Sequence, residues 1–285
     1  MSDRSAIEWT DATANFWRGC DKISPGCAHC YMFAGQRRYG RDPSVVTLAA
    51  PATFNAPLSR KWRRLAAEIE AREGRRMRVF TCSWSDFFHE AADSWRDMAW
   101  EVIRRCPEYD WQILTKRPEL VADRLPASWG DGWPNVWLGV SIENRRFVHR
   151  ADLLRETPAA VRFISAEPLL GPLIATQDLG HPTDYGTGYE HDVAWEDGRR
   201  MDDDLPSLNL AEIDWLIAGG ESGKGARRLD LQWMRDLRDA CSAGDVAYFV
   251  KQLGGARPGN RLEDLPEDLR IREFPRRPSL EAASR

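Results

Sequence analysis

The sequence lacks any long run of apolar residues. No stretch approaches the roughly eighteen consecutive apolar residues that a membrane-spanning helix needs. The first residues, MSDRSAIEWTDATANF, also lack the charged start and apolar core of a secretory signal peptide. Nor does any segment repeat itself at a period of about 20–50 residues, which argues against solenoids and propellers. We therefore expect a cytoplasmic protein without a membrane partner.

The chain also lacks an excess of positive charge. Its 285 residues include 40 Lys or Arg and 44 Asp or Glu, for a net charge of −4. Only local basic stretches could therefore bind nucleic acid. In SRKWRR, Arg60, Lys61, Arg63 and Arg64 surround the solvated side of an amphipathic helix. We interpret this stretch first as an exposed charged face, with a phosphate-binding patch as the alternative.

Short, almost wholly apolar segments alternate with helical patterns. Strands are expected at 77–83, 110–116, 135–141, 160–168, 213–222 and 246–252. Helices are expected at 58–74, 93–106 and 231–244, and in the second of these Trp95, Met98, Val102 and Cys106 share one face. Such alternation implies parallel strands with helical crossovers. The predicted fold is α/β, a full or partial parallel (β/α) barrel like a TIM barrel, with an open doubly wound sheet as the alternative.

Nearly every predicted strand ends in polar residues. In a parallel barrel these carboxyl ends open on one mouth, where ligands bind. The candidates are Ser83, Ser85 and Asp86; Lys116 and Arg117; Ser141 and Glu143; Ser165 and Glu167; Glu221 and Ser222; and Lys251 and Gln252.

We expect one barrel domain over residues 1–254. Residues 171–211 are acidic, rich in Gly and Pro, and too long for an ordinary βα loop, so they predict an insertion or lid at the mouth. The Arg- and Pro-rich residues 255–285 predict a poorly ordered tail.

Three of the six cysteines lie within eleven positions, as Cys20, Cys27 and Cys30 in a C-x6-C-x2-C arrangement. In a reducing cytoplasm, clustered thiols suggest metal binding or catalysis before disulfides. The other three lie far apart in apolar contexts and are expected to be buried small hydrophobic residues: Cys82, Cys106 and Cys241.

Three interpretations of the clustered cysteines stay open. They could hold a [4Fe–4S] cluster with one iron left for another ligand, or a zinc ion with His29 or a distant cysteine as fourth ligand. They could also be unligated. The position of His29 argues against it as a zinc ligand, because it adjoins Cys30 and neighbouring residues seldom both reach one small ion.

A three-cysteine loop near the start of a βα-barrel chain resembles the radical S-adenosylmethionine (SAM) superfamily, whose usual motif is C-x3-C-x2-C. A closer resemblance rests on seven segments in order: IEWTDATANFWRGCDKISPGCAHCY, SWSDFFHE, LTKRPE, NVWLGVSIEN, RFISAEPLLGPL, DWLIAGGESG and FVKQLG. They are similar to a family of phage and bacterial three-cysteine proteins, often labelled only as phage proteins of unknown function. That family is regarded as radical-SAM-like, with spore photoproduct lyase among its more distant relatives.

The resemblance implies a barrel of the radical SAM type. Cys20, Cys27 and Cys30 would bind a [4Fe–4S] cluster whose fourth iron is chelated by SAM. Reductive cleavage of SAM would give a 5′-deoxyadenosyl radical that abstracts hydrogen from a substrate. An electron donor such as flavodoxin or ferredoxin is implied. The superfamily commonly binds the SAM amino group with a Gly-Gly-Glu-type segment at the second strand.

Here TCSWSDFF occupies that position, so Ser83, Ser85 and Asp86 are the substitutes we expect. The remaining expected cofactor-binding residues are Ser141, Glu143, Glu221 and Ser222, and the catalytic candidates are Lys116, Glu167 and His89. Each has a structural alternative: Lys116 could pair with Glu143 or Glu167 at the rim, and His89 could cap a helix.

The expected substrate is a nucleic acid or nucleotide. One alternative is a radical SAM enzyme that acts on a protein or peptide. Another is a zinc-stabilised, non-catalytic nucleic-acid-binding or adaptor protein.

Overall fold

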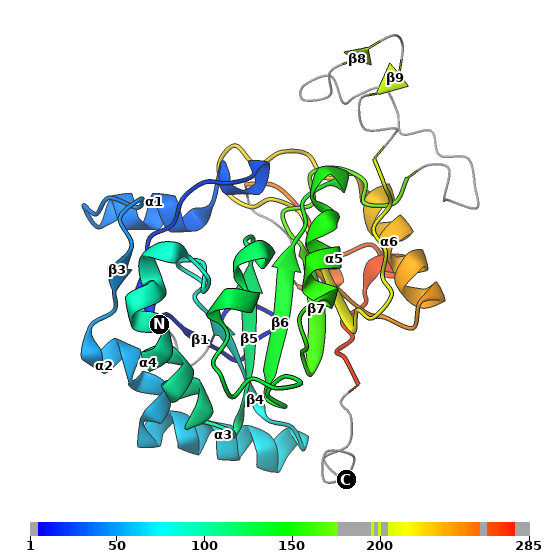
Figure 1. Ribbon diagram of the computed structural model, residues 1–285. Helices are drawn as coiled ribbons and strands as arrows, with labels where there is room; N and C mark the ends of the chain where they lie inside the picture. Colours follow the sequence, from blue (N-terminus) through cyan, green and yellow to red (C-terminus); the bar gives the residue numbers. More distant parts are fainter. Residues whose placement is uncertain (1–4, 176–194, 197–198, 201–204, 257–260, 277–285) are drawn as a thin grey trace.

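The computed structural model describes residues 5–175, 195–196, 199–200, 205–256 and 261–276 (Figure 1). Its centre is a seven-stranded sheet in which every neighbouring pair is parallel. The prediction of an α/β protein with a parallel sheet is confirmed. In order across the sheet, the strands are β1 (Ala12–Ala14), β4 (Met77–Thr81), β5 (Tyr109–Thr115), β6 (Val136–Ser141), β7 (Val161–Ala166), β10 (Trp215–Gly219) and β11 (Ala247–Gln252).

The sheet curls into a partial barrel. Its strands follow one another in chain order, as in a (β/α) barrel and unlike a doubly wound sheet. Within the described residues, β1 and β11 are the two edge strands and do not pair with each other. Of the full and the partial barrel that the sequence allowed, the structure therefore has the partial one.

Helices cover the convex face of the sheet (Figure 1). They are α3 (Arg60–Glu73), α4 (Asp93–Arg104), α5 (His149–Arg155) and α6 (Leu231–Ala243). Local sequence sets the ends of α3: the Ser59 side chain accepts a hydrogen bond from the Trp62 amide, and Gly74 ends the helix with φ +64°. Outward-facing strand residues such as Val79, Trp111 and Leu138 pack with these helices in the main core.

The buried face of α4 differs from the sequence prediction. Met98 is 46% exposed, and the buried positions include Ala99, Trp100 and Ile103. Trp100 packs edge-on against Phe87 with ring centroids 4.8 Å apart, and this contact turns the helix so that Met98 faces outward. Aromatic packing therefore overrode the helical spacing of the smaller apolar residues.

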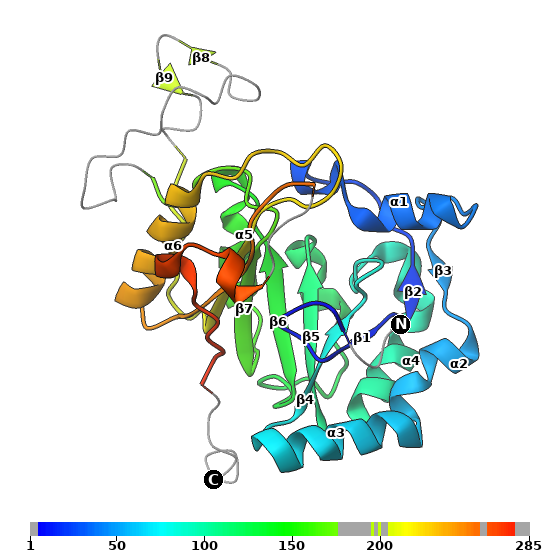
Figure 2. The ribbon, with the colours of Figure 1, turned by 180° about the vertical axis from the view of Figure 1, so that it is seen from behind.

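A second, mainly aromatic cluster lies on the concave face. Strand residues alternate between the two faces, so Phe80, Trp137 and Phe163 point inward while their neighbours point outward. Trp9 from the N-terminal segment lies among them, with its ring centroid 4.6 Å from that of Phe80. Figure 2 shows this segment in front of the sheet. The N-terminal segment thus fills part of the open side of the barrel.

The C-terminal segment packs beside β11, with Leu265 and Leu269 in the main core and Phe274 against the concave cluster. The sequence predicts a poorly ordered tail from residue 255, but residues 261–276 contain two short 3-10 helices and buried Leu265 and Leu269. The Phe274 ring lies 5.3 Å from that of Trp215. A few apolar side chains were enough to dock a segment whose overall composition is polar. The rest of the expected tail, 257–260 and 277–285, lies outside the described residues.

Most of the expected insertion at 171–211 also lies outside the described residues. At its base, Leu173 and Leu208 are buried and joined by a backbone hydrogen bond of 2.8 Å. Within it, β8 (Trp195–Glu196) pairs with β9 (Arg199–Arg200). A role as a lid falls on residues that the structure does not describe.

The remaining elements are short. A segment between β1 and α3 contains β2 (Trp17–Arg18), α1 (Tyr31–Arg38), β3 (Thr47–Leu48) and α2 (Pro51–Phe54), and β2 pairs antiparallel with β3. Among the described residues, no helix has the length and apolar character required to cross a membrane. In the part of the chain that the structure describes, the 3-10 helices are Pro25–Cys27, Ala56–Leu58, Glu90–Ala92, Pro118–Leu120, Ala122–Arg124, Arg145–Phe147, Leu262–Asp264 and Glu267–Leu269.

Candidate functional site

Polar residues from the carboxyl ends of the strands do gather at one mouth. They line a cavity of about 600 Å³, the mouth cavity, together with Tyr31, Trp84 and residues of the N-terminal segment. Of the residues that the sequence predicted at the mouth, these line the cavity: Ser83, Lys116, Ser141, Ser165, Glu167, Glu221, Ser222 and Lys251. Tyr31 and Trp84 belong to the wall as well, and the Tyr31 hydroxyl donates a hydrogen bond of 2.6 Å to the Ser83 carbonyl.

The three clustered cysteines line a second, smaller cavity. This thiol cavity, of about 120 Å³, is bounded by Cys20, Cys27 and Cys30. It shares four wall residues of the predicted site with the mouth cavity, so the two adjoin: Cys30, Ser83, Lys116 and Ser141. Ser85, Asp86 and Arg117 line the thiol cavity but not the mouth cavity.

The six-residue gap between Cys20 and Cys27 is taken up by a short turn. The 3-10 helix Pro25–Cys27 ends it, and α1 begins directly after Cys30. At the other end, the Cys20 amide donates a hydrogen bond of 2.9 Å to the Pro43 carbonyl. Gly19 has φ +96° and lies so close to the Val45 carbonyl that no side chain would fit there. The longer spacing therefore still brings all three sulfurs to one cavity.

Among the described residues, no three His, Cys, Asp or Glu side chains are grouped closely enough to hold one metal ion. In a [4Fe–4S] cluster each thiolate binds a different iron, so wider spacing is required. His29, one of the two fourth ligands weighed for the zinc alternative, lines the mouth cavity, and its Nδ1 lies 3.0 Å from Glu221 Oε2.

Burial favours the protonated form of two of the clustered thiols, those of Cys20 and Cys30. It raises the pKa of Cys20 to about 12; nearby Asp86 adds to this effect and Arg117 opposes it. Burial likewise raises the pKa of Cys30. Because metals bind thiolates, metal binding at this site must displace protons from these groups.

Arg117 lies beside one of the clustered cysteines, and no sequence pattern indicated this contact. It was expected only as a polar strand end, yet its buried guanidinium places Nη1 3.7 Å from Cys20 Sγ. Asp86 Oδ2 lies 3.4 Å from the same nitrogen. Arg117 therefore brings a positive charge and a hydrogen-bond donor to the edge of the thiol cavity.

The expected substitutes for the SAM-binding segment are largely held by the protein itself. The Asp86 carboxylate accepts hydrogen bonds from Thr115 Oγ1 at 2.7 Å and from the Lys116 amide at 2.9 Å. Ser85 Oγ donates to the Gly19 carbonyl at 2.5 Å. Ser83 Oγ accepts a hydrogen bond from the side chain of Asn15, a residue that the sequence did not suggest. Ser83 also lies at the wall that the two cavities share.

The Glu143 side chain contacts the cysteine loop through Ser24. It is wholly buried, forms ion pairs with Lys116 and Arg150, and accepts a 2.5 Å hydrogen bond from Ser24 Oγ. Burial alone would raise the pKa of this carboxyl group, but Lys116 and Arg150 outweigh it and the pKa is lowered. Glu143 lines neither cavity. The expected alternative for Lys116, a salt bridge with Glu143 at the rim, is therefore present.

Glu167 and Lys251 form the other ion pair at the mouth. Both line the mouth cavity, and Gln252 Nε2 donates to Glu167 Oε1 at 3.3 Å. Each lysine that lines the mouth cavity, Lys116 or Lys251, is thus matched by a carboxylate within the protein.

Glu221 joins the late strands to the cysteine loop. Its carboxylate accepts hydrogen bonds from the Arg227 side chain and amide, while Arg227 Nη2 also donates to the Pro25 carbonyl at 2.9 Å. Burial would raise the Glu221 pKa, but the bonds from Arg227 and His29 lower it to about 2. We call Glu221, Arg227, His29 and Pro25 the clasp, because they link the segment after β10 to the cysteine loop.

His89 lies outside both cavities. It is buried, its Nδ1 accepts a hydrogen bond of 3.2 Å from the Ala91 amide, and its Nε2 lies 3.0 Å from Asp21 Oδ2. The structure thus places this catalytic candidate in the capping position that was its alternative.

Two further expectations are confirmed. Cys82, Cys106 and Cys241 are buried and free. The basic residues of SRKWRR lie on the exposed side of α3, whereas Trp62 in the same stretch is buried.

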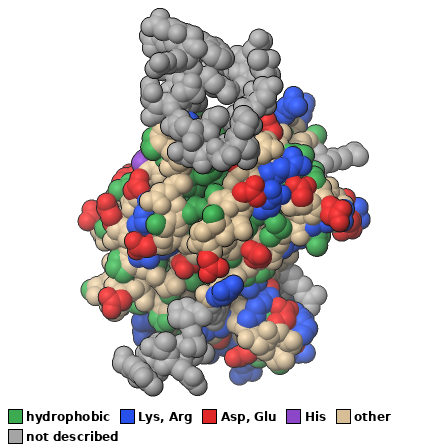
Figure 3. Space-filling view, turned by 90° about the vertical axis from the view of Figure 1, so that its right-hand side faces the viewer, with side chains coloured by type: hydrophobic (Ala, Val, Ile, Leu, Met, Phe, Trp, Pro, Cys, Tyr) green, Lys and Arg blue, Asp and Glu red, His purple; other side chains and the backbone are tan. Residues whose placement is uncertain are grey.

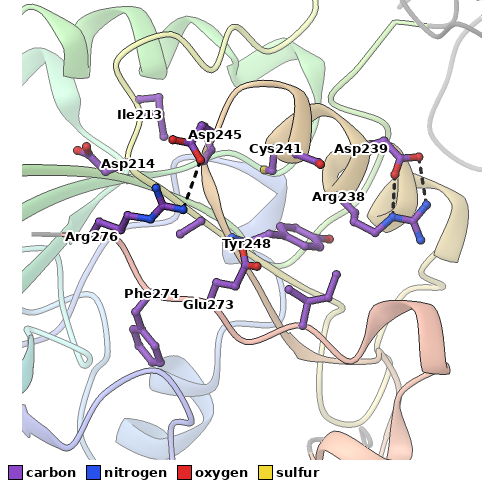
Figure 4. Close-up of a pocket in the computed structure, with 14 residues that line it drawn as sticks. Ile213, Asp214, Arg238, Asp239, Cys241, Asp245, Tyr248, Glu273, Phe274 and Arg276 are labelled. Atoms are coloured by element: carbon purple, nitrogen blue, oxygen red, sulfur yellow. Dashed lines mark hydrogen bonds and ion pairs between the residues drawn. The ribbon is translucent and has the colours of Figure 1, made fainter. Parts of the chain in front are cut away.

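A third cavity, of about 700 Å³, lies near the opposite end of the sheet (Figure 4). It is lined by residues that precede β10 and β11, such as Asp214 and Val246, and by Glu273 and Phe274 of the C-terminal segment. None of the clustered cysteines or predicted site residues reaches it. Although it is large, it is separate from the chemistry described above.

No curated protein and no solved structure matches this chain. Residues 4–272 match the family described as "Protein of unknown function (DUF5131)". The match spans the partial barrel, the cysteine loop and most of the packed C-terminal segment, and the chain therefore belongs to this family.

Proposed function

We propose that this protein is a radical-SAM-like enzyme. Cys20, Cys27 and Cys30 would bind a [4Fe–4S] cluster, with SAM in the adjoining mouth cavity. The observation that carries the proposal is that the three cysteines line one small cavity, which shares walls with a larger one at the carboxyl ends of parallel strands. When bound, the cluster and SAM supply a 5′-deoxyadenosyl radical that abstracts hydrogen from the substrate.

The chain's own residues would position SAM at the shared wall. Ser83 and Ser141 offer hydroxyl groups that can accept hydrogen bonds from an ammonium group. Lys116 can donate a hydrogen bond to a carboxylate at the same wall, while its ion-pair partner Glu143 holds its side chain in place. Asp86, whose oxygens are engaged within the protein, would act by holding Thr115 and Lys116.

The proposed substrate is a nucleotide or nucleic acid. Tyr31 and Trp84 present aromatic rings at the mouth cavity, and a base can stack on such rings. Glu167 and Lys251 neutralise each other in the cavity wall, so the cavity itself suits an uncharged base more than a phosphate. An extended phosphate backbone would have to lie outside it.

Metal analysis after anaerobic purification and reconstitution with iron and sulfide tests the proposal. We expect about four irons and four sulfides per chain, and a brown colour that Cys27→Ala removes. Cys82→Ala is the matched control, because Cys82 also lines the thiol cavity but is not one of the clustered cysteines. One zinc per chain without iron, or a cluster that survives Cys27→Ala, would contradict the proposal.

A further inference from the structure

The exposed apolar side chains are concentrated in one segment. Seven large hydrophobic residues are exposed in the described part of the chain, and five of them lie between residues 23 and 48: Ile23, Tyr31, Tyr39, Val45 and Leu48. This is the segment that contains the cysteine loop and α1. A gathering of exposed apolar side chains on a soluble domain commonly marks an interaction site.

The same segment is basic, although the chain is acidic overall. Residues 18–48 carry five Lys or Arg and two Asp, whereas the whole chain has a net charge of −4. Arg37 and Arg38 end α1, Arg41 follows it, and all three are exposed. We define the cysteine-loop face by seven exposed residues, Lys22, Ile23, Arg37, Arg38, Tyr39, Arg41 and Val45; Asp21 and Asp42 are exposed in the same segment.

This face reaches the thiol cavity at Ile23. Ile23 is 41% exposed and also lines that cavity, so a single side chain separates the cavity from solvent there. The Val45 carbonyl lies against Gly19, and the Pro43 carbonyl accepts the hydrogen bond from the Cys20 amide. The cysteine-loop face is therefore a thin wall next to the cysteines.

The opposite side of the molecule has no such charge bias. Figure 3 shows interspersed acidic and basic side chains on the side that contains α6. Some of these charges are paired there, as in Arg235 with Asp268 at 2.8 Å and Arg238 with Asp239 at 2.7 Å. Paired charges of both signs attract no partner of one sign.

We propose that the cysteine-loop face docks a small, acidic electron-carrier protein. The proposal rests on the proposed function, because it requires a cluster behind the face. Arg37, Arg38 and Arg41 complement acidic residues on the carrier, and the apolar centre around Ile23 excludes water. Redox encounters use small interfaces steered by opposite charges. One electron leaves the reduced carrier and enters the cluster, and no atom is transferred.

The position of the face favours a carrier over a nucleic acid. Arginines beside exposed tyrosines could also bind a phosphate backbone. A substrate, however, must reach the mouth cavity, and Ile23, Val45 and the three arginines do not line it. Ile23 lines the thiol cavity instead, and Val45 lies against Gly19, the residue before Cys20.

Charge reversal tests the proposal. The variant is Arg37→Glu, Arg38→Glu and Arg41→Glu combined. The matched control reverses the same number of charges on the exposed side of α3, which lies at the far end of the molecule from α1 (Figure 1): Arg60→Glu, Lys61→Glu and Arg64→Glu. The probe is flavodoxin, measured in two ways: the affinity of its oxidised form for the reconstituted protein, and the rate at which its reduced form reduces the cluster.

We expect the reversal at α1 to weaken flavodoxin binding at least tenfold and to slow flavodoxin-driven reduction similarly. Iron content and reduction by dithionite should stay unchanged, and the α3 variant should behave as wild type. Wild-type affinity should also fall steeply with added salt, which keeps the test informative if the triple variant does not fold.

Unchanged flavodoxin affinity in a cluster-containing α1 variant would overturn the docking proposal and leave the proposed function standing. Salt-independent binding by the wild-type protein would overturn it as well. Loss of binding to a single-stranded oligonucleotide, with unchanged flavodoxin affinity, would assign the face to nucleic acid instead. A wild-type protein that binds no cluster would reject the proposed function, and the docking proposal with it.

Discussion

Arg117 Nη1 lies 3.7 Å from Cys20 Sγ, and the two residues are 97 positions apart in the sequence. The guanidinium is buried and held by Asp86 at 3.4 Å, so it cannot easily turn away. A fixed cation beside one of the three clustered sulfurs stabilises any added negative charge at this site. This contact connects the end of β5 to the cysteine loop.

Arg117→Gln should lower the reduction potential of the bound cluster while leaving its iron content unchanged. Hydrogen bonds to cluster sulfurs are among the factors that set this potential. A hydrogen bond to a charged group is worth about 1.5 kcal/mol, which corresponds to about 60 mV for one electron. A redox titration followed by electron paramagnetic resonance measures the shift.

Arg117→Lys is the control for this prediction, because it keeps the positive charge but loses the planar fork of donors. Its potential should lie between those of the wild type and Arg117→Gln. Equal potentials in all three proteins would show that the contact with Cys20 has no electrostatic effect on the cluster.

Gly26→Ala should loosen the cysteine loop. A β-carbon at position 26 would lie 2.5 Å from Glu143 Oε1, and Glu143 is fixed by Lys116 and Arg150. The loop must therefore shift, at a cost of about 1–3 kcal/mol in the free energy of unfolding. Chemical denaturation measures this cost, and iron content after reconstitution should fall with it.

Gly244→Ala serves as the comparison for Gly26→Ala. A β-carbon there would approach the nearest atom only to 3.4 Å, and the residue follows α6 and lines neither the thiol cavity nor the mouth cavity. Iron content should stay at the wild-type level in this variant. Equal stability and equal iron content in both variants would show that the contact between Gly26 and Glu143 does not support the loop.

The clasp should make stability depend on pH through Glu221. Its pKa falls from the ordinary 4.5 to about 2 in the folded protein, chiefly because Arg227 bonds outweigh the effect of burial. A lowered carboxyl pKa contributes stability that is fully present above about pH 4.5 and is lost as the pH falls towards 2. Glu221→Gln should therefore lose about 1–3 kcal/mol at pH 7, the typical cost of weakening hydrogen bonds to a charged group.

Urea denaturation at pH 7, 4.5, 3 and 2 checks the clasp prediction. The difference between wild type and Glu221→Gln should be largest at pH 7 and should shrink below pH 4.5. A difference that stays constant down to pH 2 would mean that the ionised carboxylate of Glu221 adds nothing to the clasp.

Much of the fold could be predicted from local sequence, because the strands are continuous apolar runs and the helices have clear ends. The failures have physical causes. The strand Ala12–Ala14 is too short to show a pattern, and Met98 lost its buried place to Trp100. Phe274 docks against Trp215 from a segment whose composition is polar.

The candidate site was predicted in its residue types more than in its contacts. Local spacing identified the three cysteines and the polar strand ends. It could not show that Asp86 and Glu143 would be used to hold neighbouring residues, since this depends on how strands lie beside each other. The contact of His29 with Glu221 joins residues 192 positions apart, and no sequence pattern marks it.

The central claim is that the cysteine loop holds a cluster that works on SAM in the mouth cavity. Its most direct test is incubation of the reconstituted protein with SAM and dithionite, followed by an assay for 5′-deoxyadenosine. We predict that 5′-deoxyadenosine forms with the wild-type protein and not with Cys30→Ala. Its absence in a wild-type protein with an intact, reduced cluster would contradict the account.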